Sequence, residues 1–166
     1  MLTYHKTTEE EKEMRTLAKY LRNYKKEIIT AWQYAGQYAI YNTTPYAEQK
    51  KQGVGFANPK NNFYSFFDHD TLVGFINLYE EPTEVFFGIG VRPDACGRGY
   101  GQQMTKAACD LSGRLFPGKP LYLEVRTWNA RAVRCYEKAG FRITGEPIRQ
   151  TTAAGDGVFY HMVRKI

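Results

Sequence analysis

The 166-residue sequence lacks the features that mark several classes of protein. Its three cysteines, Cys96, Cys109 and Cys135, are odd in number and lack metal-ligand spacing, so neither a disulfide framework nor a metal site is expected. No apolar run approaches about 18 residues, which argues against a transmembrane helix. Residues 1–8 lack the apolar core of a signal peptide. These absences together predict a cytoplasmic protein with reduced thiols.

The charge pattern favours anionic partners without choosing among them. The formal net charge of +6 at pH 7 would suit nucleic acid, an acidic protein or a phosphorylated cofactor. The basic residues are spread out, with no block of about five or six like charges, so a nucleic-acid-binding arm is not expected. Nucleic acid and membranes are therefore not expected partners.

The N-terminal third is predicted to be helical. A short strand is expected first, at residues 2–6. Thr8 and the glutamates after it resemble a capping box. Apolar residues then recur at helical spacing: Met14, Leu17, Leu21, Tyr24 and Ile28. Residues 43–61 contain prolines, glycines and amides and are expected to form a mobile loop.

The rest of the chain alternates strands and helices. Strands are expected at residues 62–68, 71–80, 84–92, 121–126, 141–147 and 158–164, and helices at residues 100–114 and 129–139. The strands at 84–92 and 121–126 flank a helical crossover, so they should be parallel. The predicted fold class is α/β (α+β), with a mixed and mostly antiparallel sheet that carries helices on both faces.

A glycine-rich segment, Gly88-Ile-Gly-Val-Arg-Pro-Asp-Ala-Cys-Gly-Arg-Gly-Tyr-Gly101, carries the clearest chemical signal. It predicts a strand, a proline turn, and a loop that opens into a helix. Such a loop places unpaired backbone N–H groups at the positive end of a helix dipole, where phosphate binds. It is not a P-loop, and its last glycine comes one residue early for G-x-G-x-x-G. Taken alone, the segment also fits a tight strand-to-helix turn.

A second motif follows: Leu123-Glu-Val-Arg-Thr-Trp-Asn129, then Ala132, Tyr136 and Gly140-Phe141. Together the two motifs resemble the GNAT superfamily of acetyl-CoA-dependent N-acetyltransferases over roughly residues 62–166. The second motif is most similar to the bacterial ribosomal-protein N-terminal acetyltransferases. The resemblance implies one GNAT domain over 1–166, with a splayed parallel strand pair. Residues 1–61 would supply acceptor-side helices and a loop, and residues 62–166 the acetyl-CoA-binding core.

The resemblance also implies which residues bind acetyl-CoA. Loop residues would hold the pyrophosphate: Gly97, Arg98, Gly99, Tyr100, Gly101 and Gln102. Ile89, Gly90 and Val91 match the strand whose backbone pairs with the pantetheine arm. Asn129 matches a CoA contact, although its type is also explained as a helix N-cap. Cys96 stands where the family usually has Gln or Arg, and no His lies close in sequence to make it a nucleophile.

Two catalytic roles follow from the same resemblance. Tyr136 aligns with the tyrosine that protonates the departing CoA thiolate; otherwise it is a half-buried helix tyrosine. The attacking amine must lose a proton, to a carboxylate or through water, and Glu124 matches the base of the ribosomal-protein acetyltransferases. Its alternative role is an ion pair with Arg126 on the same sheet face. Glu84 is the rival base, placed one residue early for the histone acetyltransferase position unless a bulge restores the face.

The implied function is transfer of acetyl from acetyl-CoA to a primary amine by direct attack in a ternary complex, with no metal. The acceptor stays open between a protein N-terminus, a lysine and a small amine, with the second motif leaning slightly towards an N-terminus. The resemblance also allows a homodimer. The alternative is a non-catalytic CoA-binding or sensing module that acts through a partner protein, and intact Tyr136 and Glu124 argue against it.

Overall fold

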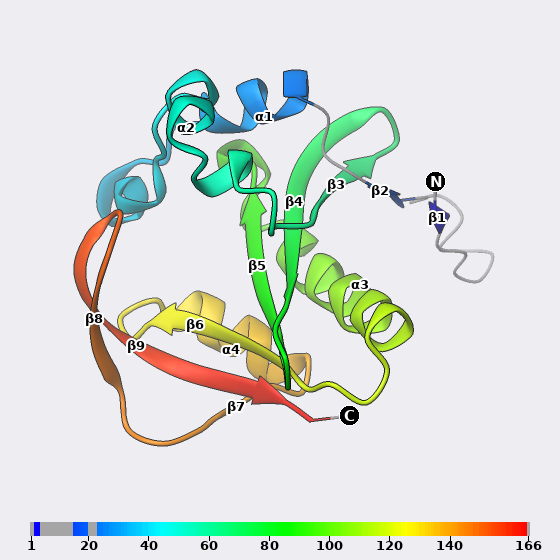
Figure 1. Cartoon of the computed structure of the whole chain (residues 1–166), viewed down its shortest axis with the longest axis vertical. Helices are drawn as coiled ribbons and strands as arrows, with labels where there is room; N and C mark the ends of the chain where they lie inside the picture. The colour runs from blue at the N-terminus through cyan, green and yellow to red at the C-terminus, as the bar shows by residue number, and fades with distance from the viewer. Residues whose placement is uncertain (1, 4–14, 20–22, 166) are drawn as a thin grey trace. The chain divides into compact units, whose positions relative to one another are not determined.

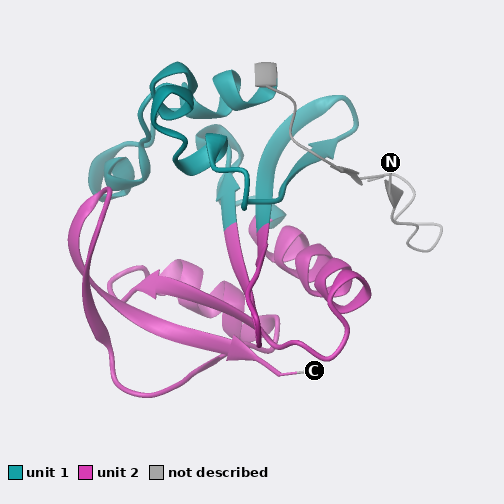
Figure 2. Ribbon diagram, viewed as in Figure 1, with its two compact units in different colours: residues 1–77, 89–100 teal, residues 78–88, 101–166 magenta. Residues whose placement is uncertain are grey.

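The computed structural model describes residues 2–3, 15–19 and 23–165, with side chains from residue 25 onward. The chain forms two compact units (Figure 2): residues 1–77 with 89–100, and residues 78–88 with 101–166. Strand β4 (Thr71–Glu80), strand β5 (Val85–Val91) and helix α3 (Tyr100–Leu115) each contribute residues to both units. The single-domain organisation, divided near residue 61, stays a prediction.

Nine strands are described, and their order is β1-β2-β3-β4-β5-β6-β9-β7, with β8 paired to β9 (Figure 1). The strands not yet bounded are β1 (Leu2–Thr3), β2 (Arg15–Lys19), β3 (Phe63–Asp68), β6 (Leu121–Arg126), β7 (Arg142–Ile143), β8 (Ile148–Thr152) and β9 (Gly155–Arg164). The β5–β6 pair is parallel, and β3–β4 and β6–β9 are among the antiparallel pairs. The mixed, mostly antiparallel fold class is confirmed.

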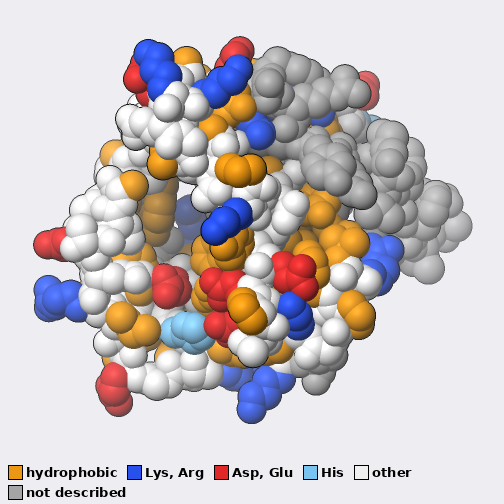
Figure 3. Space-filling view, in the orientation of Figure 1, with side chains coloured by type: hydrophobic (Ala, Val, Ile, Leu, Met, Phe, Trp, Pro, Cys, Tyr) orange, Lys and Arg blue, Asp and Glu red, His pale blue; other side chains and the backbone are white. Residues whose placement is uncertain are grey.

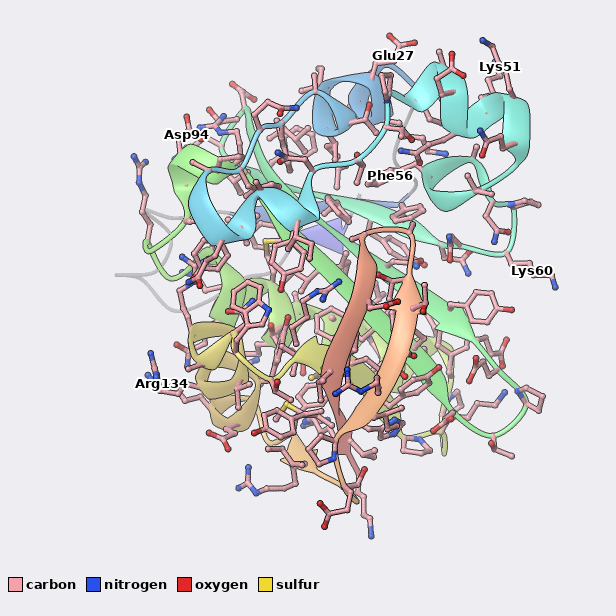
Figure 4. All side chains as sticks on the ribbon, turned by 90° about the vertical axis from the view of Figure 1, so that its left-hand side faces the viewer. Glu27, Lys51, Phe56, Lys60, Asp94 and Arg134 are labelled. Carbon is pink, nitrogen blue, oxygen red and sulfur yellow. The ribbon has the colours of Figure 1, made fainter. Side chains whose placement is uncertain are left out.

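The first unit builds its core from aromatic side chains. Its helical segments are α1 (Asn23–Thr30), η2 (Gly36–Tyr41), α2 (Tyr46–Gln52), η3 (Gly55–Ala57) and η4 (Pro93–Ala95). Buried Ile29, Tyr46 and Phe56 form a cluster against which Phe63 and Phe75 pack. Phe56 and Phe75 meet edge to face with ring centroids 5.0 Å apart. Phe56 lies among these rings, whereas Lys51 of α2 points away from the ribbon (Figure 4).

The helix predicted after residue 14 is wrong for residues 15–19, which form strand β2. This strand pairs antiparallel with β3, from Arg15 opposite Asp68 to Lys19 opposite Tyr64. Helical spacing of a few apolar residues does not distinguish a helix from a short strand. Here the hydrogen-bonded pairing with β3, which is distant in sequence, makes the segment a strand. Residues 2–3 confirm the start of the first predicted strand, and the capping box at Thr8 lies outside the described residues.

The loop predicted at residues 43–61 is also wrong, because it contains α2 and η3. Its proline and glycines bound these helices: Pro45 precedes α2, and Gly53 follows it in the left-handed region with φ 66°. Buried Gln49 stabilises the segment, since its Nε2 donates to the Thr44 carbonyl (2.7 Å) and its Oε1 accepts from the Phe56 amide (2.8 Å). These side-chain contacts have no periodic signature in the sequence.

The second unit contains α3 after its first residue, α4 (Ala130–Lys138) and strands β6 to β9. The largest side chains of its core are fully buried: Phe87, Phe141, Met104 and Met162. Figure 1 shows β6 and β9 side by side, in agreement with their six-residue ladder. The strand predicted at 141–147 shrinks to β7, and the polar strand β8 was missed. Its residues are mostly exposed, so it has no apolar alternation to detect.

The parallel pair between β5 and β6 is short. Its ladder joins Val85 to Leu121 and Phe86 to Tyr122. Both strands continue past these pairs, β5 to Val91 and β6 to Arg126. The other edge of β6 pairs with β9 over all six residues of β6, from Leu121 to Arg126. The backbone of β5 beyond Phe86 therefore extends past the parallel ladder.

Candidate active site

The glycine loop in the first unit has the backbone geometry that an anion-binding turn requires. Gly97 and Gly99 adopt φ of 79° and 83°, which L side chains rarely adopt, and α3 begins at Tyr100 directly after them. Gly97, Arg98 and Gly99 are exposed. Exposed backbone immediately before a helix N-terminus is suited to binding a phosphate. The pyrophosphate role of the loop stays a prediction.

Side chains of the first unit hold both ends of this loop. Tyr100 is buried, and its hydroxyl donates a hydrogen bond to the Asp68 carboxylate at the end of β3. At the other end the Arg92 amide donates to the Val73 carbonyl (2.8 Å), and the Arg92 guanidinium pairs with Asp94. A cavity of about 320 Å³ lies here, with Asp68, Arg92, Arg98 and Tyr100 among the residues that line it. These contacts anchor both ends of the loop.

The end of β5 has a partner that sequence reasoning missed. The Tyr34 hydroxyl donates to the Val91 carbonyl at 2.7 Å, although the two residues are 57 positions apart. Burial raises the pKa of Tyr34 well above its ordinary value, and the Cys96 thiol adds to the rise. The phenol therefore stays protonated and able to donate. Ile89, Gly90 and Val91 form the final part of β5, as expected, and Tyr34 fixes the last of their carbonyls.

The thiol of Cys96 points back to the strand that precedes it. Its Sγ lies 3.5 Å from the Arg92 carbonyl, as a weak donor. All three cysteines are free, and burial raises the pKa of the Cys109 and Cys135 thiols. Cys96 thus contacts the backbone of its own turn.

The Phe75 ring on β4 leaves no room for a side chain at position 90, which is therefore glycine. A Cβ built at this position would lie 2.2 Å from Cε1 and 2.5 Å from Cζ of Phe75. Phe75 cannot move freely, because it packs against the Phe56 and Phe63 rings at centroid distances of 5.0 and 5.9 Å. Only glycine fits at the middle of the predicted pantetheine-binding stretch.

We expect Gly90→Ala to lower the free energy of unfolding by about 2 kcal/mol, because the added methyl overpacks a rigid aromatic cluster. Chemical denaturation of the full chain measures this. Gly113→Ala is the control: a Cβ at Gly113 meets nothing within 4 Å, and alanine should stabilise α3 by about 0.5–1 kcal/mol. Equal stability of Gly90→Ala and the wild type would contradict the steric account.

Tyr136 lies on α4 in the second unit, where its ring packs edge to face against two phenylalanines. Its centroid is 6.3 Å from that of Phe87 at an interplanar angle of 81°, and 6.1 Å from that of Phe141 at 63°. The side chain is half-buried. Edge-to-face packing of this kind fixes the ring and hence the direction of the hydroxyl. Its role as an acid stays a prediction.

Asn129 caps α4 as predicted. Its Oδ1 accepts from the Ala132 amide at 3.3 Å, and the residue is buried. Gly101 and Gln102 occupy the first turn of α3, where the Gly101 carbonyl accepts from the Thr105 hydroxyl (2.7 Å). All three residues thus lie at the helix starts where the sequence predicts them. Their contact with CoA stays a prediction.

Glu124 and Arg126 on β6 have different partners, and the ion pair considered between them is not formed among the described side chains. Exposed Glu124 accepts a hydrogen bond from Gln150 Nε2 at 2.6 Å. Buried Arg126 donates to the Asp156 carbonyl (3.2 Å) and the Thr152 hydroxyl (3.4 Å). Glu124 thus keeps a carboxylate that no cation neutralises within this ladder, which suits a base.

Glu84 lies directly before β5, where its carbonyl accepts from the Glu81 amide at 2.9 Å. Tyr122 of β6 connects these acidic residues, since its hydroxyl lies 3.2 Å from Glu81 Oε2. The pKa of the Tyr122 phenol is raised, chiefly by burial. The Glu81 carboxylate adds to the rise, and the carboxylates of Glu84 and Glu124 add less. Figure 3 shows acidic side chains gathered near a histidine on the face turned to the viewer.

The short parallel ladder and the glycine loop that opens into a helix agree with the fold that the sequence motifs predict. The chain belongs to the Acetyltransferase (GNAT) family, which matches residues 14–141. Family members use acetyl-CoA as cosubstrate. Among the described helices, none combines the length and apolarity needed to cross a membrane.

Curated relatives match part of the chain. N-alpha-acetyltransferase RimI of Mycobacterium tuberculosis is 32% identical over 99 residues, which cover 54% of this chain and 57% of the relative. Peptidyl-lysine N-acetyltransferase YjaB of Salmonella typhimurium is 36% identical over 78 residues, covering 47% and 48%. The chain spans about half the length of these relatives.

Solved structures share the fold over nearly the whole chain. Spermidine N-acetyltransferase from Vibrio cholerae, in complex with CoA and spermine, has a TM-score of 0.72 at 20% identity, covering 91% of this chain and 95% of that one. The ribosomal-protein-S18-alanine N-acetyltransferase from Escherichia coli has a TM-score of 0.65 at 22% identity, covering 92% and 94%. At this identity the likeness shows the fold alone.

Proposed function

We propose that this protein transfers the acetyl group of acetyl-CoA to a primary amine. The observation that carries the proposal is the backbone of the glycine loop, with two left-handed glycines directly before α3, in a member of the GNAT family. Gly97, Arg98, Gly99, Tyr100, Gly101 and Gln102 bind the pyrophosphate, and Asn129 adds a CoA contact. Ile89, Gly90 and Val91 pair with the pantetheine arm.

The reaction runs in a ternary complex without a covalent enzyme intermediate. Glu124 takes a proton from the ammonium, directly or through water, and the neutral amine attacks the thioester carbon. Backbone donors of β5 stabilise the developing oxyanion. The N–C bond forms, the C–S bond breaks, and Tyr136 donates its proton to the departing thiolate. The second proton of the amine nitrogen then leaves and returns the Tyr136 phenol to its neutral form, directly or through water. Glu84 is the second candidate for the base.

The acceptor class is a primary amine, and three kinds are in view. One curated relative is named for α-amino groups and another for peptidyl-lysine, while the Vibrio cholerae structure holds spermine. We place a protein N-terminus first, because the second motif of this chain resembles the ribosomal-protein enzymes. Cytoplasmic location, a single domain and a homodimer belong to the same proposal.

The test is thiol release from acetyl-CoA, with the acceptor's acetylation confirmed by mass spectrometry. The acceptors are peptides with a free N-terminus and no lysine, N-blocked lysine peptides, and spermidine. We expect one class to accelerate thiol release at least about a hundredfold over hydrolysis. CoA binding without acceleration by any class would support the non-catalytic sensing module instead.

A further inference from the structure

Polar side chains of β6 and β8 form hydrogen bonds on one face of the sheet, around the position of Gly157 on β9. Arg126 of β6 lies opposite Phe159 of β9, and Gln150 of β8 lies opposite Gly157. Gly157 has no side chain, and a Cβ there would lie 2.2 Å from Arg126 Nη1. The gap at Gly157 therefore lets the Arg126 guanidinium extend along β9 towards β8.

Arg126 fixes the β8–β9 hairpin to β6. Its guanidinium donates to the Asp156 carbonyl and the Thr152 hydroxyl and lies over the Phe159 ring, 4.8 Å from the centroid. Only 5% of the residue is exposed. The guanidinium bonds to both sides of the hairpin turn and so restricts the motion of the hairpin. Breaking these bonds would leave a buried positive charge without hydrogen-bond acceptors, which costs free energy.

The hairpin holds Gln150 against the predicted base. Gln150 Nε2 donates to Oε2 of Glu124 at 2.6 Å, over 26 positions of sequence. Glu124 is otherwise an exposed side chain on a strand, with several rotamers open to it. A single neutral donor on one oxygen selects among those rotamers and leaves Oε1 available to a substrate proton.

We propose that Gln150 is a positioning residue, which holds the Glu124 carboxylate in the orientation that accepts the proton of the amine. The proposal rests on the role given to Glu124 above. Arg126 and Gly157 act one step further away, by fixing the hairpin that carries Gln150. Gln150 itself does not touch the reacting atoms.

The experiment is a double-mutant cycle on the full chain, with kcat and the KM values for acetyl-CoA and for the best acceptor. Gln150→Met keeps the length of the side chain and removes the donor. We expect kcat to fall about tenfold with the KM for acetyl-CoA unchanged, because a misplaced base slows chemistry alone. Glu124→Gln should lower kcat about a hundredfold. Arg149→Ala, an exposed change on the same strand, should keep wild-type kcat.

The double variant decides the proposal. If Gln150 acts through Glu124, the double variant is no slower than Glu124→Gln alone. A further tenfold loss in the double variant, or wild-type kcat for Gln150→Met, would overturn the positioning role while leaving the base in place. Wild-type kcat for Glu124→Gln would instead overturn the base assignment, and the role of Gln150 with it.

Discussion

We expect replacement of Tyr136 with phenylalanine to lower kcat by about a hundredfold, while the protein keeps its stability and its affinity for acetyl-CoA. The phenyl ring preserves the packing against Phe87 and Phe141, so only the proton donor is lost. Without that donor, the thiolate leaves unprotonated, and loss of one general acid costs about 10²-fold or more. Steady-state thiol release at saturating acceptor measures kcat, and thermal unfolding measures stability.

Tyr160→Phe is the control for this change. Tyr160 lies on β9 in the same unit, is equally half-buried, and has no role in the proposed reaction. Its hydroxyl should be removable without effect on kcat. Unchanged turnover in Tyr136→Phe would remove Tyr136 from the mechanism, and equal losses in the two variants would point to a general effect on folding.

We expect Gly99→Ala to weaken acetyl-CoA binding by about tenfold or more. The added methyl strains a backbone with φ of 83° and would stand where we propose that the pyrophosphate binds, and strain of this kind costs about 1–3 kcal/mol. Since the chemistry is unchanged once acetyl-CoA is bound, kcat at saturation should fall much less than the affinity. Calorimetric titration with CoA measures the dissociation constant.

Gly118→Ala separates backbone strain from phosphate contact. Gly118 follows α3 with φ of 85°, and a Cβ there meets nothing within 4 Å. Both variants therefore carry nearly the same strain, and both should lose similar stability. Only Gly99→Ala should lose CoA affinity. Equal affinity of the two variants for CoA would contradict the placement of the pyrophosphate at Gly99.

Much of the second half of the chain could be predicted because local patterns determine it. The alternation in β3, β4 and β5, the apolar stripe of α3 and the Asn129 cap all involve residues within a few positions of one another. The motifs mark Tyr136 and Glu124 as candidate site residues, but no sequence pattern marks the side chains that surround them. The rings of Phe87 and Phe141 around Tyr136 emerge only when strand and helix pack.

The contacts that sequence reasoning missed connect distant residues without any periodicity. Tyr34 reaches Val91 across 57 positions, and Gln150 reaches Glu124 across 26. Strand β2 was mistaken for helix because its pairing with β3 depends on residues about 50 positions away. Gln49 closes the turn around α2 with bonds that no pattern marks. Hydrogen bonds of this kind form only once segments that are distant in sequence have packed together, so no local pattern predicts them.

The most direct test of the account is the initial rate of thiol release with acetyl-CoA and the accepted amine both varied. Direct attack in a ternary complex requires both substrates to be bound together, so reciprocal plots should intersect, and release without amine should stay at the rate of slow hydrolysis. Parallel lines, the pattern of an acetyl-enzyme intermediate, would contradict direct transfer from acetyl-CoA to the amine.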